Sequence, residues 1–159
     1  MLYHMSIAAD EPQRVATVIA ELWGGEALPF PPVAEGAWIA MAGDLRNSAI
    51  EVYPRGTALH EADGDADAVG AAMPPIRHTA THMALGTVLD RGRVMRIAAR
   101  EGWPAKYRKR GELFGVIELW IEGCQMVEVL TATMVQEYRE TMGIAKWRKM
   151  LAEMQPEAA

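Results

Sequence analysis

The sequence predicts an α+β protein in which two βαβββ modules form a curved mixed sheet, followed by a C-terminal helix. The first observation behind this prediction is that one order of elements occurs twice. A strand, a helix and three further extended segments follow one another in residues 1–54 and again in residues 78–131. The second observation is a histidine and a glutamate that recur at nearly the same spacing in both copies.

The first module begins with alternating apolar and polar residues, the period of a strand. Asp10 is an acidic N-cap with a proline in the first turn after it, and Gly24-Gly25 ends the resulting helix by supplying positive φ angles. The remaining segment contains prolines and then two short β-rich runs. In order, the elements are a strand at 2–9, a helix at 10–23, an irregular edge strand or loop at 27–34, and strands at 36–42 and 48–54.

Residues 55–77 are rich in Gly, Ala, Pro and acidic residues, and they predict a solvated, partly mobile linker between the modules. The second module then repeats the first, with Asp90 capping its helix and Gly102 ending it. Its elements are a strand at 79–87, that helix, a polar and basic segment at 104–110, and strands at 114–121 and 126–131. A helix predicted at 133–153 has no counterpart in the first module, and residues 132–159 form the C-terminal helix and tail.

The recurring residues are His4 and Glu51, 47 positions apart (51 − 4), and His82 and Glu128, 46 positions apart (128 − 82). Strand parity places each of them opposite an apolar row and beside small neighbours such as Ser6. A sheet face with small residues around His and Glu leaves space for a ligand. Two imidazoles and two carboxylates that converge are the donor set of a divalent-metal site.

Composition excludes several classes of function. The net charge of −5 argues against nonspecific binding to nucleic acid or to an anionic membrane. The lone Cys124 excludes an internal disulfide and a Cys-rich zinc motif. The N-terminus does not have the pattern of a signal peptide, and no segment reaches the ~20 apolar residues of a membrane span, so we expect a cytoplasmic protein.

With this element order, and with a His near the start and a Glu in the last strand of each copy, the chain resembles the vicinal oxygen chelate superfamily. This superfamily includes glyoxalase I, methylmalonyl-CoA epimerase, extradiol dioxygenases and the bleomycin- and fosfomycin-resistance proteins. The resemblance implies a glyoxalase-like fold in which each module is a U-shaped half-barrel and a metal ion lies between two of them. The ligands that it implies are His4, Glu51, His82 and Glu128. Ligand hardness permits Zn²⁺, Ni²⁺, Co²⁺, Mn²⁺ or Fe²⁺.

The resemblance also implies a function, a metal-dependent lyase or isomerase that acts on a small substrate with vicinal oxygens through an enediolate-type intermediate. Glu51, Glu128 or Glu118 would move the proton, and Trp38 and Trp120 would form apolar walls of the pocket. The alternative is a non-catalytic protein that binds and sequesters a small compound, as the bleomycin-resistance proteins do. A third alternative is an Fe²⁺-dependent dioxygenase. Homodimers are common in this superfamily, and the C-terminal helix with its apolar face is a candidate for the contact.

Other reactive residue types carry weaker indications. His78 lies four residues before His82, but on one strand the two would be ~13 Å apart, too far to bind the same ion. His60 lies in the acidic linker, and Cys124 lies in a predicted turn without a neighbouring His. The basic run 106–110 indicates a solvated loop more than a binding site for an anion.

Overall fold

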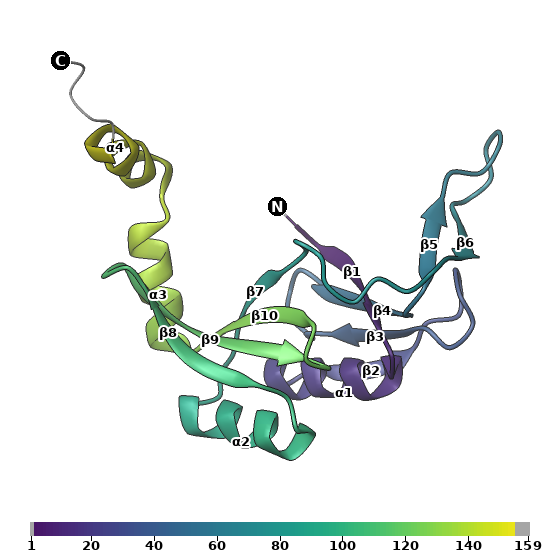
Figure 1. Cartoon of the computed structure of the whole chain (residues 1–159), viewed down its shortest axis with the longest axis horizontal. Helices are drawn as coiled ribbons and strands as arrows, with labels where there is room; N and C mark the ends of the chain where they lie inside the picture. The colour runs from purple at the N-terminus through teal and green to yellow at the C-terminus, as the bar shows by residue number, and fades with distance from the viewer. Residues whose placement is uncertain (1, 155–159) are drawn as a thin grey trace.

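The computed structural model describes residues 2–154, and it contains two four-stranded sheets of the same topology (Figure 1). The first module comprises β1 (His4–Ala9), α1 (Pro12–Trp23), β2 (Glu26–Pro29), β3 (Trp38–Met41) and β4 (Ala49–Pro54). The second comprises β7 (Met83–Gly86), α2 (Arg91–Glu101), β8 (Ala105–Arg110), β9 (Phe114–Ile121) and β10 (Gln125–Leu130). The predicted α+β fold of two βαβββ modules is confirmed.

The strand order is the same in both sheets. It is β1-β4-β3-β2 in the first and β7-β10-β9-β8 in the second. β1 runs parallel to β4, and β7 runs parallel to β10, whereas the other neighbours are antiparallel. Because the first and last strands of each module are direct neighbours, the residues of the His…Glu repeat lie on adjacent strands.

One apolar core joins the two modules. α1 packs on β2, β3 and β4, and α2 packs on β8, so both helices cover the same side of the molecule (Figure 1). Beneath them lie the apolar rows that strand parity predicts, because burying these rows removes the largest apolar area from water. The buried residues include Ile7, Ile50, Val52, Ile117, Leu119, Val127 and Val129. The opposite faces of the two sheets carry Glu51 and Glu128. The helix that follows β10 covers part of the second of these faces, where Tyr138 packs on Phe114.

Two glycines after α1 have different structural roles. Gly24 has φ +73°, a left-handed conformation that ends the helix. Gly25 approaches β3 so closely that a Cβ there would lie 1.9 Å from the carbonyl oxygen of Met41. Glycine is therefore required at both positions: at 24 for the left-handed backbone conformation, and at 25 because β3 leaves no room for a side chain.

The start of α1 differs from the prediction. Glu11, not Asp10, is the N-cap residue, and its side chain makes no capping hydrogen bond. Instead the Glu122 carboxylate, from the turn between β9 and β10, accepts hydrogen bonds from the backbone N–H groups of Asp10 and Glu11, each at 2.8 Å. A carboxylate at a helix N-terminus satisfies free N–H groups and interacts favourably with the helix dipole. The second module thus caps the helix of the first.

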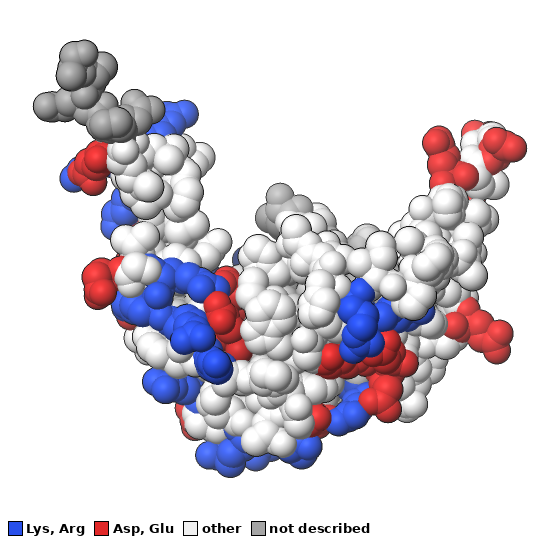
Figure 2. Space-filling view, in the orientation of Figure 1, with Lys and Arg blue, Asp and Glu red and all other residues white. Residues whose placement is uncertain are grey.

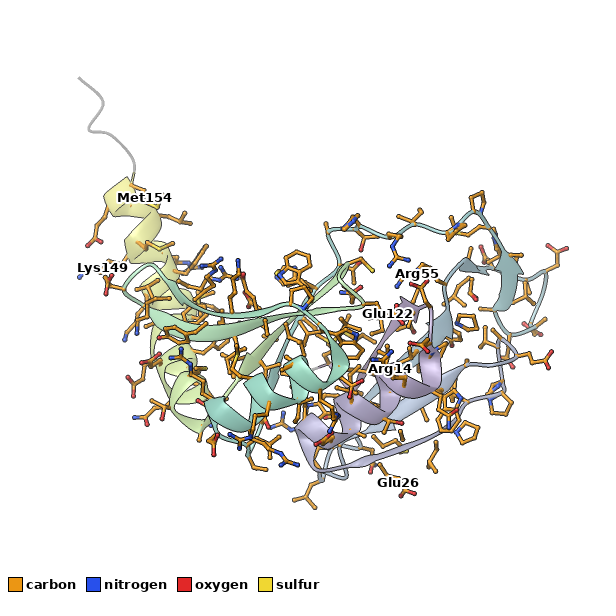
Figure 3. All side chains as sticks on the ribbon, turned by 60° about the horizontal axis from the view of Figure 1, so that its bottom comes forward. Arg14, Glu26, Arg55, Glu122, Lys149 and Met154 are labelled. Atoms are coloured by element: carbon orange, nitrogen blue, oxygen red, sulfur yellow. The ribbon has the colours of Figure 1, made fainter. Side chains whose placement is uncertain are left out.

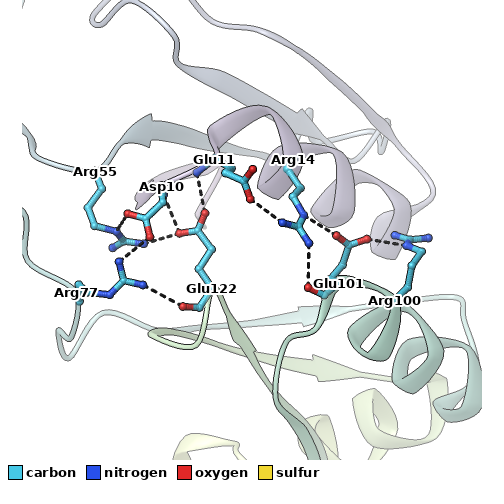
Figure 4. Close-up of polar contacts among 8 residues, drawn as sticks. All are labelled: Asp10, Glu11, Arg14, Arg55, Arg77, Arg100, Glu101 and Glu122. Atoms are coloured by element: carbon cyan, nitrogen blue, oxygen red, sulfur yellow. Dashed lines mark hydrogen bonds and ion pairs between the residues drawn. The ribbon is translucent and has the colours of Figure 1, made fainter.

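Arginines complete this junction between the modules (Figure 4). The Arg55 guanidinium donates to Asp10 and to Glu122, in both cases at 2.6 Å, and Arg77 donates to the other oxygen of Asp10 at 2.6 Å. The side chains of Arg55 and Glu122 are only 6% and 8% exposed. Figure 3 shows Arg55 and Glu122 together where the modules meet.

A second set of ion pairs joins the two helices. Arg14 on α1 donates to the Glu101 carboxylate at 2.8 Å and to the Glu101 carbonyl oxygen at 2.9 Å. Arg100 on α2 contacts the same carboxylate (Figure 4). It also donates to the Glu21 carboxylate on α1 at 2.7 Å. The relative orientation of the modules is therefore set by polar contacts at both ends of α1.

The predicted linker contains regular structure. β5 (Thr57–His60) and β6 (Val69–Ala72) form an antiparallel hairpin that projects at one end of the molecule (Figure 1). Leu59 and Val69 are 52% and 50% exposed, so the hairpin buries little. The hairpin is exposed, in keeping with a solvated linker, but its pairing was not predicted from the sequence.

The C-terminal segment is two helices, not the single helix predicted. α3 (Ala132–Thr141) packs on β9 and β10, whereas α4 (Ile144–Met154) has no buried residue. They are separated at Met142 and Gly143, and glycine weakens a helix interior. α4 extends away from the sheets, with Lys149 and Met154 far from the modules (Figures 1 and 3). Within residues 2–154, no helix is long and apolar enough to cross a membrane.

Candidate functional site

The carboxylate of Glu51 lies on the open side of the first sheet among three polar side chains. Its Oε2 accepts hydrogen bonds from the Ser6 hydroxyl and the Tyr53 hydroxyl, each at 2.9 Å. Its Oε1 lies 3.8 Å from Nε2 of His4. The register explains the cluster, because Ser6 pairs with Glu51, and residues two positions away on either strand share its face.

The two oxygens of Glu51 therefore have different surroundings. Burial, and then the hydrogen bond to Glu51, raise the pKa of Tyr53 to about 12, so its hydroxyl stays a donor at physiological pH. Both hydroxyls orient Oε2, while Oε1 is turned toward the imidazole. The His4 side chain is 63% exposed, so this edge of the cluster is open to an incoming group.

The separation of His4 and Glu51 suits one metal ion. Two ligand atoms about 2.1 Å from an ion in tetrahedral geometry are about 3.4 Å apart. The 3.8 Å between Nε2 and Oε1 is close to this value, so a small rotation of either side chain would bring both within ligand distance. An imidazole and a carboxylate are also donors that first-row divalent ions accept. The residues of the first module fit half of a metal site.

The second module repeats the geometry in register. Glu128 pairs with Ala84 as Glu51 pairs with Ser6, and in each case the His lies two positions before the paired residue. His82 stands immediately before β7, with its Nδ1 3.2 Å from the carbonyl oxygen of Ala80. The matched sequence spacings therefore correspond to matched positions in the two sheets.

The surroundings of the second carboxylate are different. Glu128 is buried, and its Oε1 accepts hydrogen bonds from Arg110, from Nε at 3.1 Å and also from Nη2. The same Nη2 lies 2.7 Å from Oε1 of Glu118. Hydrogen bonding to Glu128, opposed in part by burial, raises the pKa of Arg110 above its ordinary value. A guanidinium thus neutralises the carboxylates that the second module brings together.

Arg110 belongs to a basic row on β8. The segment predicted as a solvated loop is a strand, in which Lys106, Arg108 and Arg110 alternate with residues that face α2. Tyr107 is one of the latter, because its ring lies 4.5 Å beneath the Arg91 guanidinium of α2. Figure 2 shows basic side chains gathered over this strand.

The first module is apolar where the second is charged. Lys106 pairs with Glu118 across β8 and β9, and the matching pair across β2 and β3 is Leu28 and Ile39. Since directly paired residues share a face, the two open faces differ in character. A site built from both modules would have one apolar side and one charged side.

The two tryptophans predicted as pocket walls lie on different faces. Trp120 pairs with Met126 and shares the face of Glu118 and Glu128, as predicted. Trp38 pairs with Val52, which is fully buried beneath α1, so Trp38 lies on the helix side. The prediction for Trp38 is wrong because the register of β3 with β4 is one residue away from the one assumed.

The four predicted ligands are not gathered into one cluster by a single chain. His4 and Glu51 are together, but among residues 2–154 no three His, Cys, Asp or Glu side chains are arranged to hold a metal ion. The sequence argument also missed Tyr53, and it included Arg110 only in a basic run, without its pairing to Glu128. Tyr53 lies two positions after Glu51, so strand parity contains the signal for it.

A pocket lies against the same face of the first sheet. Its volume is about 210 Å³, and it is bounded by β1, β4 and the chain after β6. Apolar, hydroxyl-bearing and charged side chains line it, including Ser6, Tyr53, Arg55, Leu59, Ile76 and Arg77. Ser6 and Tyr53 are the residues that hold Glu51, so the pocket adjoins the His4–Glu51 cluster.

Neither a protein-family model nor a curated protein matches this sequence. Solved structures match its fold. The fosfomycin resistance protein FosX from Mesorhizobium loti is 14% identical, with a TM-score of 0.51 over 86% of this chain and 95% of that one. A FosX from Listeria monocytogenes, complexed with Mn(II) and sulfate, is 10% identical, with a TM-score of 0.55 over 88% and 96%.

The trypanothione-dependent glyoxalase I of Leishmania major also matches, at 13% identity and a TM-score of 0.53 over 96% of this chain and 98% of that one. Identities this low establish a shared fold and leave the activity to be tested. The resemblance indicated by the element order and the paired His…Glu spacing is confirmed as a resemblance of fold.

Proposed function

We propose, on the premise that this chain has the glyoxalase-like fold of the vicinal oxygen chelate superfamily, that it is a divalent-metal-dependent lyase or isomerase. Its substrate is a small molecule with two neighbouring oxygens. The observation that carries the proposal is the His4–Glu51 pair, held by Ser6 and Tyr53 with one carboxylate oxygen facing the imidazole. In the second sheet Glu128 has the register position of Glu51, and His82 lies two positions before Ala84, which pairs with Glu128.

The metal ligands in this proposal are His4, Glu51, His82 and Glu128. A divalent ion held there would supply Lewis-acid stabilisation of negative charge on neighbouring substrate oxygens. Zn²⁺, Ni²⁺, Co²⁺, Mn²⁺ and Fe²⁺ all suit two imidazoles and two carboxylates. The Mn(II) in the Listeria FosX supports testing Mn²⁺ first.

A second copy of the chain would complete the site. One chain carries one half-site on each open face and does not bring the two together. In a two-fold homodimer, the first module of each copy would face the second module of the other, giving two identical sites. α4 supports this arrangement, because Ile144 and Trp147 are 75% and 44% exposed on a helix that has no buried residue.

Proton transfer is assigned to Glu51, Glu128 or Glu118. Glu51 is oriented by two hydroxyl donors, which fixes the direction of its free oxygen. Glu118 pairs with Glu128 across β9 and β10, so it lies next to the proposed ligands without being one of them. A carboxylate beside a reacting carbon is a suitable general base. A cytoplasmic location is part of the same proposal.

One observation favours a second candidate function, the binding of a small molecule without catalysis. The pocket of about 210 Å³ beside β1 and β4 is lined by the apolar Leu59 and Ile76, by hydroxyl-bearing side chains and by the arginines Arg55 and Arg77. Such a combination suits a small ligand with an apolar part and polar or anionic groups. Because the pocket suits either function, the presence or absence of a bound metal ion distinguishes the enzyme from the binding protein.

Metal analysis of the purified protein tests the proposal. We expect one divalent ion per chain by inductively coupled plasma mass spectrometry after dialysis against Mn²⁺, and its loss in His4→Ala and His82→Ala. His60→Ala is the matched control, because His60 lies in the exposed hairpin and should leave the metal content unchanged. If the wild type holds no stoichiometric ion, and the double His variant binds small ligands as the wild type does, the enzyme is excluded in favour of the binding protein.

A further inference from the structure

The two carboxylates of the repeat are neutralised in different ways. Glu51 is hydrogen-bonded by two uncharged hydroxyls and has only an imidazole beside its other oxygen. Glu128 is paired with a guanidinium that contacts the same oxygen twice. The two half-sites have matching His…Glu spacings in the sequence, but only the carboxylate of the second is already paired with a positively charged side chain.

The guanidinium stands where a cation would bind. Nε of Arg110 is 3.1 Å from Oε1 of Glu128, and its Nη2 bridges to Glu118 at 2.7 Å. A metal ligated by Oε1 would lie about 2.1 Å from that oxygen. An ion and a guanidinium on the same oxygen would be only a few ångströms apart, where two positive charges repel strongly in a partly buried site. The guanidinium therefore weakens the binding of a cation at that oxygen.

The carboxylates of Glu128 and Glu118 have little access to solvent. The side chains of Glu128 and Glu118 are 11% and 16% exposed, so neither can exchange its partner for bulk water. Charged groups with so little exposure need a counter-ion, and a charge-assisted pair with Arg is a strong one. Arg110 is 35% exposed, so its long side chain has a path out of the cluster.

We propose that Arg110 is an internal counter-ion that competes with a divalent cation for Glu128. Without the ion, Arg110 neutralises both carboxylates and keeps the second module charge-balanced. With the ion, Arg110 leaves Glu128 and turns toward solvent along the row of Lys106 and Arg108. This inference rests on the proposed function, because the cation is the metal proposed there. It adds that the affinity for the metal is set by a residue that is not a ligand.

The test compares Mn²⁺ binding by the wild type and Arg110→Gln in the full chain. Isothermal titration calorimetry and the electron paramagnetic resonance signal of free Mn²⁺ both report binding without requiring activity. We expect Arg110→Gln to bind Mn²⁺ at least about tenfold more tightly at pH 7, because the ion no longer displaces a buried ion pair. Arg110→Met, which also lacks the charge but keeps an apolar stem, replaces it if the Gln variant fails to fold.

Arg108→Gln is the matched control. It removes the same charge from the same face of β8, but the only contact of Arg108 with these carboxylates is to Glu118 at 3.5 Å. We expect its affinity for Mn²⁺ to change by less than about threefold, since Glu128 keeps its partner. An equal gain in both arginine variants would show a general effect of net charge and overturn the proposal.

The outcomes separate this inference from the proposed function. Binding by the wild type with equal affinity in Arg110→Gln overturns the competition and leaves the metal enzyme intact. Binding by Arg110→Gln alone supports the competition and ends the metal-dependent function of the wild type. If neither protein binds Mn²⁺, and titrations with Zn²⁺, Ni²⁺, Co²⁺ and Fe²⁺ are also negative, both proposals are wrong.

Discussion

Arg55→Met is expected to destabilise the protein by about 3 kcal/mol, because it removes one partner of a buried ion pair. Its guanidinium pairs with Glu122 at 2.6 Å, and the two side chains are 6% and 8% exposed. Removing one partner of a buried pair typically costs about 3–5 kcal/mol, because it leaves the other charge buried without compensation. Methionine keeps the apolar stem, so the change acts on charge and hydrogen bonding.

Two features of the site adjust this figure. Glu122 retains two backbone hydrogen bonds of 2.8 Å at the start of α1, where the helix dipole contributes about 0.5–1 kcal/mol to holding a negative charge. This lowers the cost of losing Arg55. The lost contact with Asp10, which is 42% exposed, adds only about 0–1 kcal/mol. The expected loss is therefore about 2–4 kcal/mol.

Arg77→Met is the matched control, since Arg77 binds the same Asp10 carboxylate at 2.6 Å but is 50% exposed. We expect it to cost about 0–1 kcal/mol. Urea unfolding followed by circular dichroism, at one fixed protein concentration, measures both variants. Thermal unfolding should show a fall in Tm of about 6–12 °C for Arg55→Met. Equal stability of the two variants would refute the claim that burial of the Arg55–Glu122 pair holds the modules together.

Three further predictions concern titration, acid and assembly. Tyr53, whose pKa is raised to about 12 by burial and then by Glu51, should titrate in the ultraviolet spectrum well after pH 10, and Tyr53→Phe should abolish that late phase. Burial raises the pKa values of Asp10 and Glu101, but hydrogen bonds from arginines outweigh it and hold both below 3.8 and 4.5, their ordinary values. The stabilisation from these two ionised carboxylates is therefore present above about pH 4.5 and is lost as the pH falls through the lowered pKa values. We expect the urea midpoint of unfolding to be level from pH 7 to 5.5 and to fall below pH 4.5. A midpoint that stays level down to pH 3 would contradict this. A chain that ends before Ile144 should lose dimers in light scattering while keeping its circular dichroism per residue, and an unchanged mass ratio would show that α4 is not in the contact.

Much of the fold was predictable because its signals are local. The strand at 114–121 and the ends of both helices, at Gly24 and Gly102, agree with the structure. Alternation has a period of two residues along one strand, so it also placed Ser6 on the face of Glu51. The same rule, applied one step further, would have found Tyr53.

The errors arise where a residue's partner is distant in sequence. Trp38 was assigned to the wrong face because its side depends on the register of β3 with β4, which a single strand does not contain. The segment 104–110 was taken as a loop because its charges hide an edge strand whose pairing with β9 supplies the hydrogen bonds.

The sequence by itself determined the two modules, their element order and the faces of the sheets that carry His4, Glu51, His82 and Glu128. These follow from periodicity, caps and spacing, all of which act over a few residues. Only the tertiary structure decided that Glu122 caps a helix 111 residues earlier in the chain, and that Arg110 pairs with Glu128. Such contacts depend on how twisted sheets and packed helices bring together side chains that are far apart in the sequence. A pattern over a few neighbouring residues does not specify which distant side chains will meet.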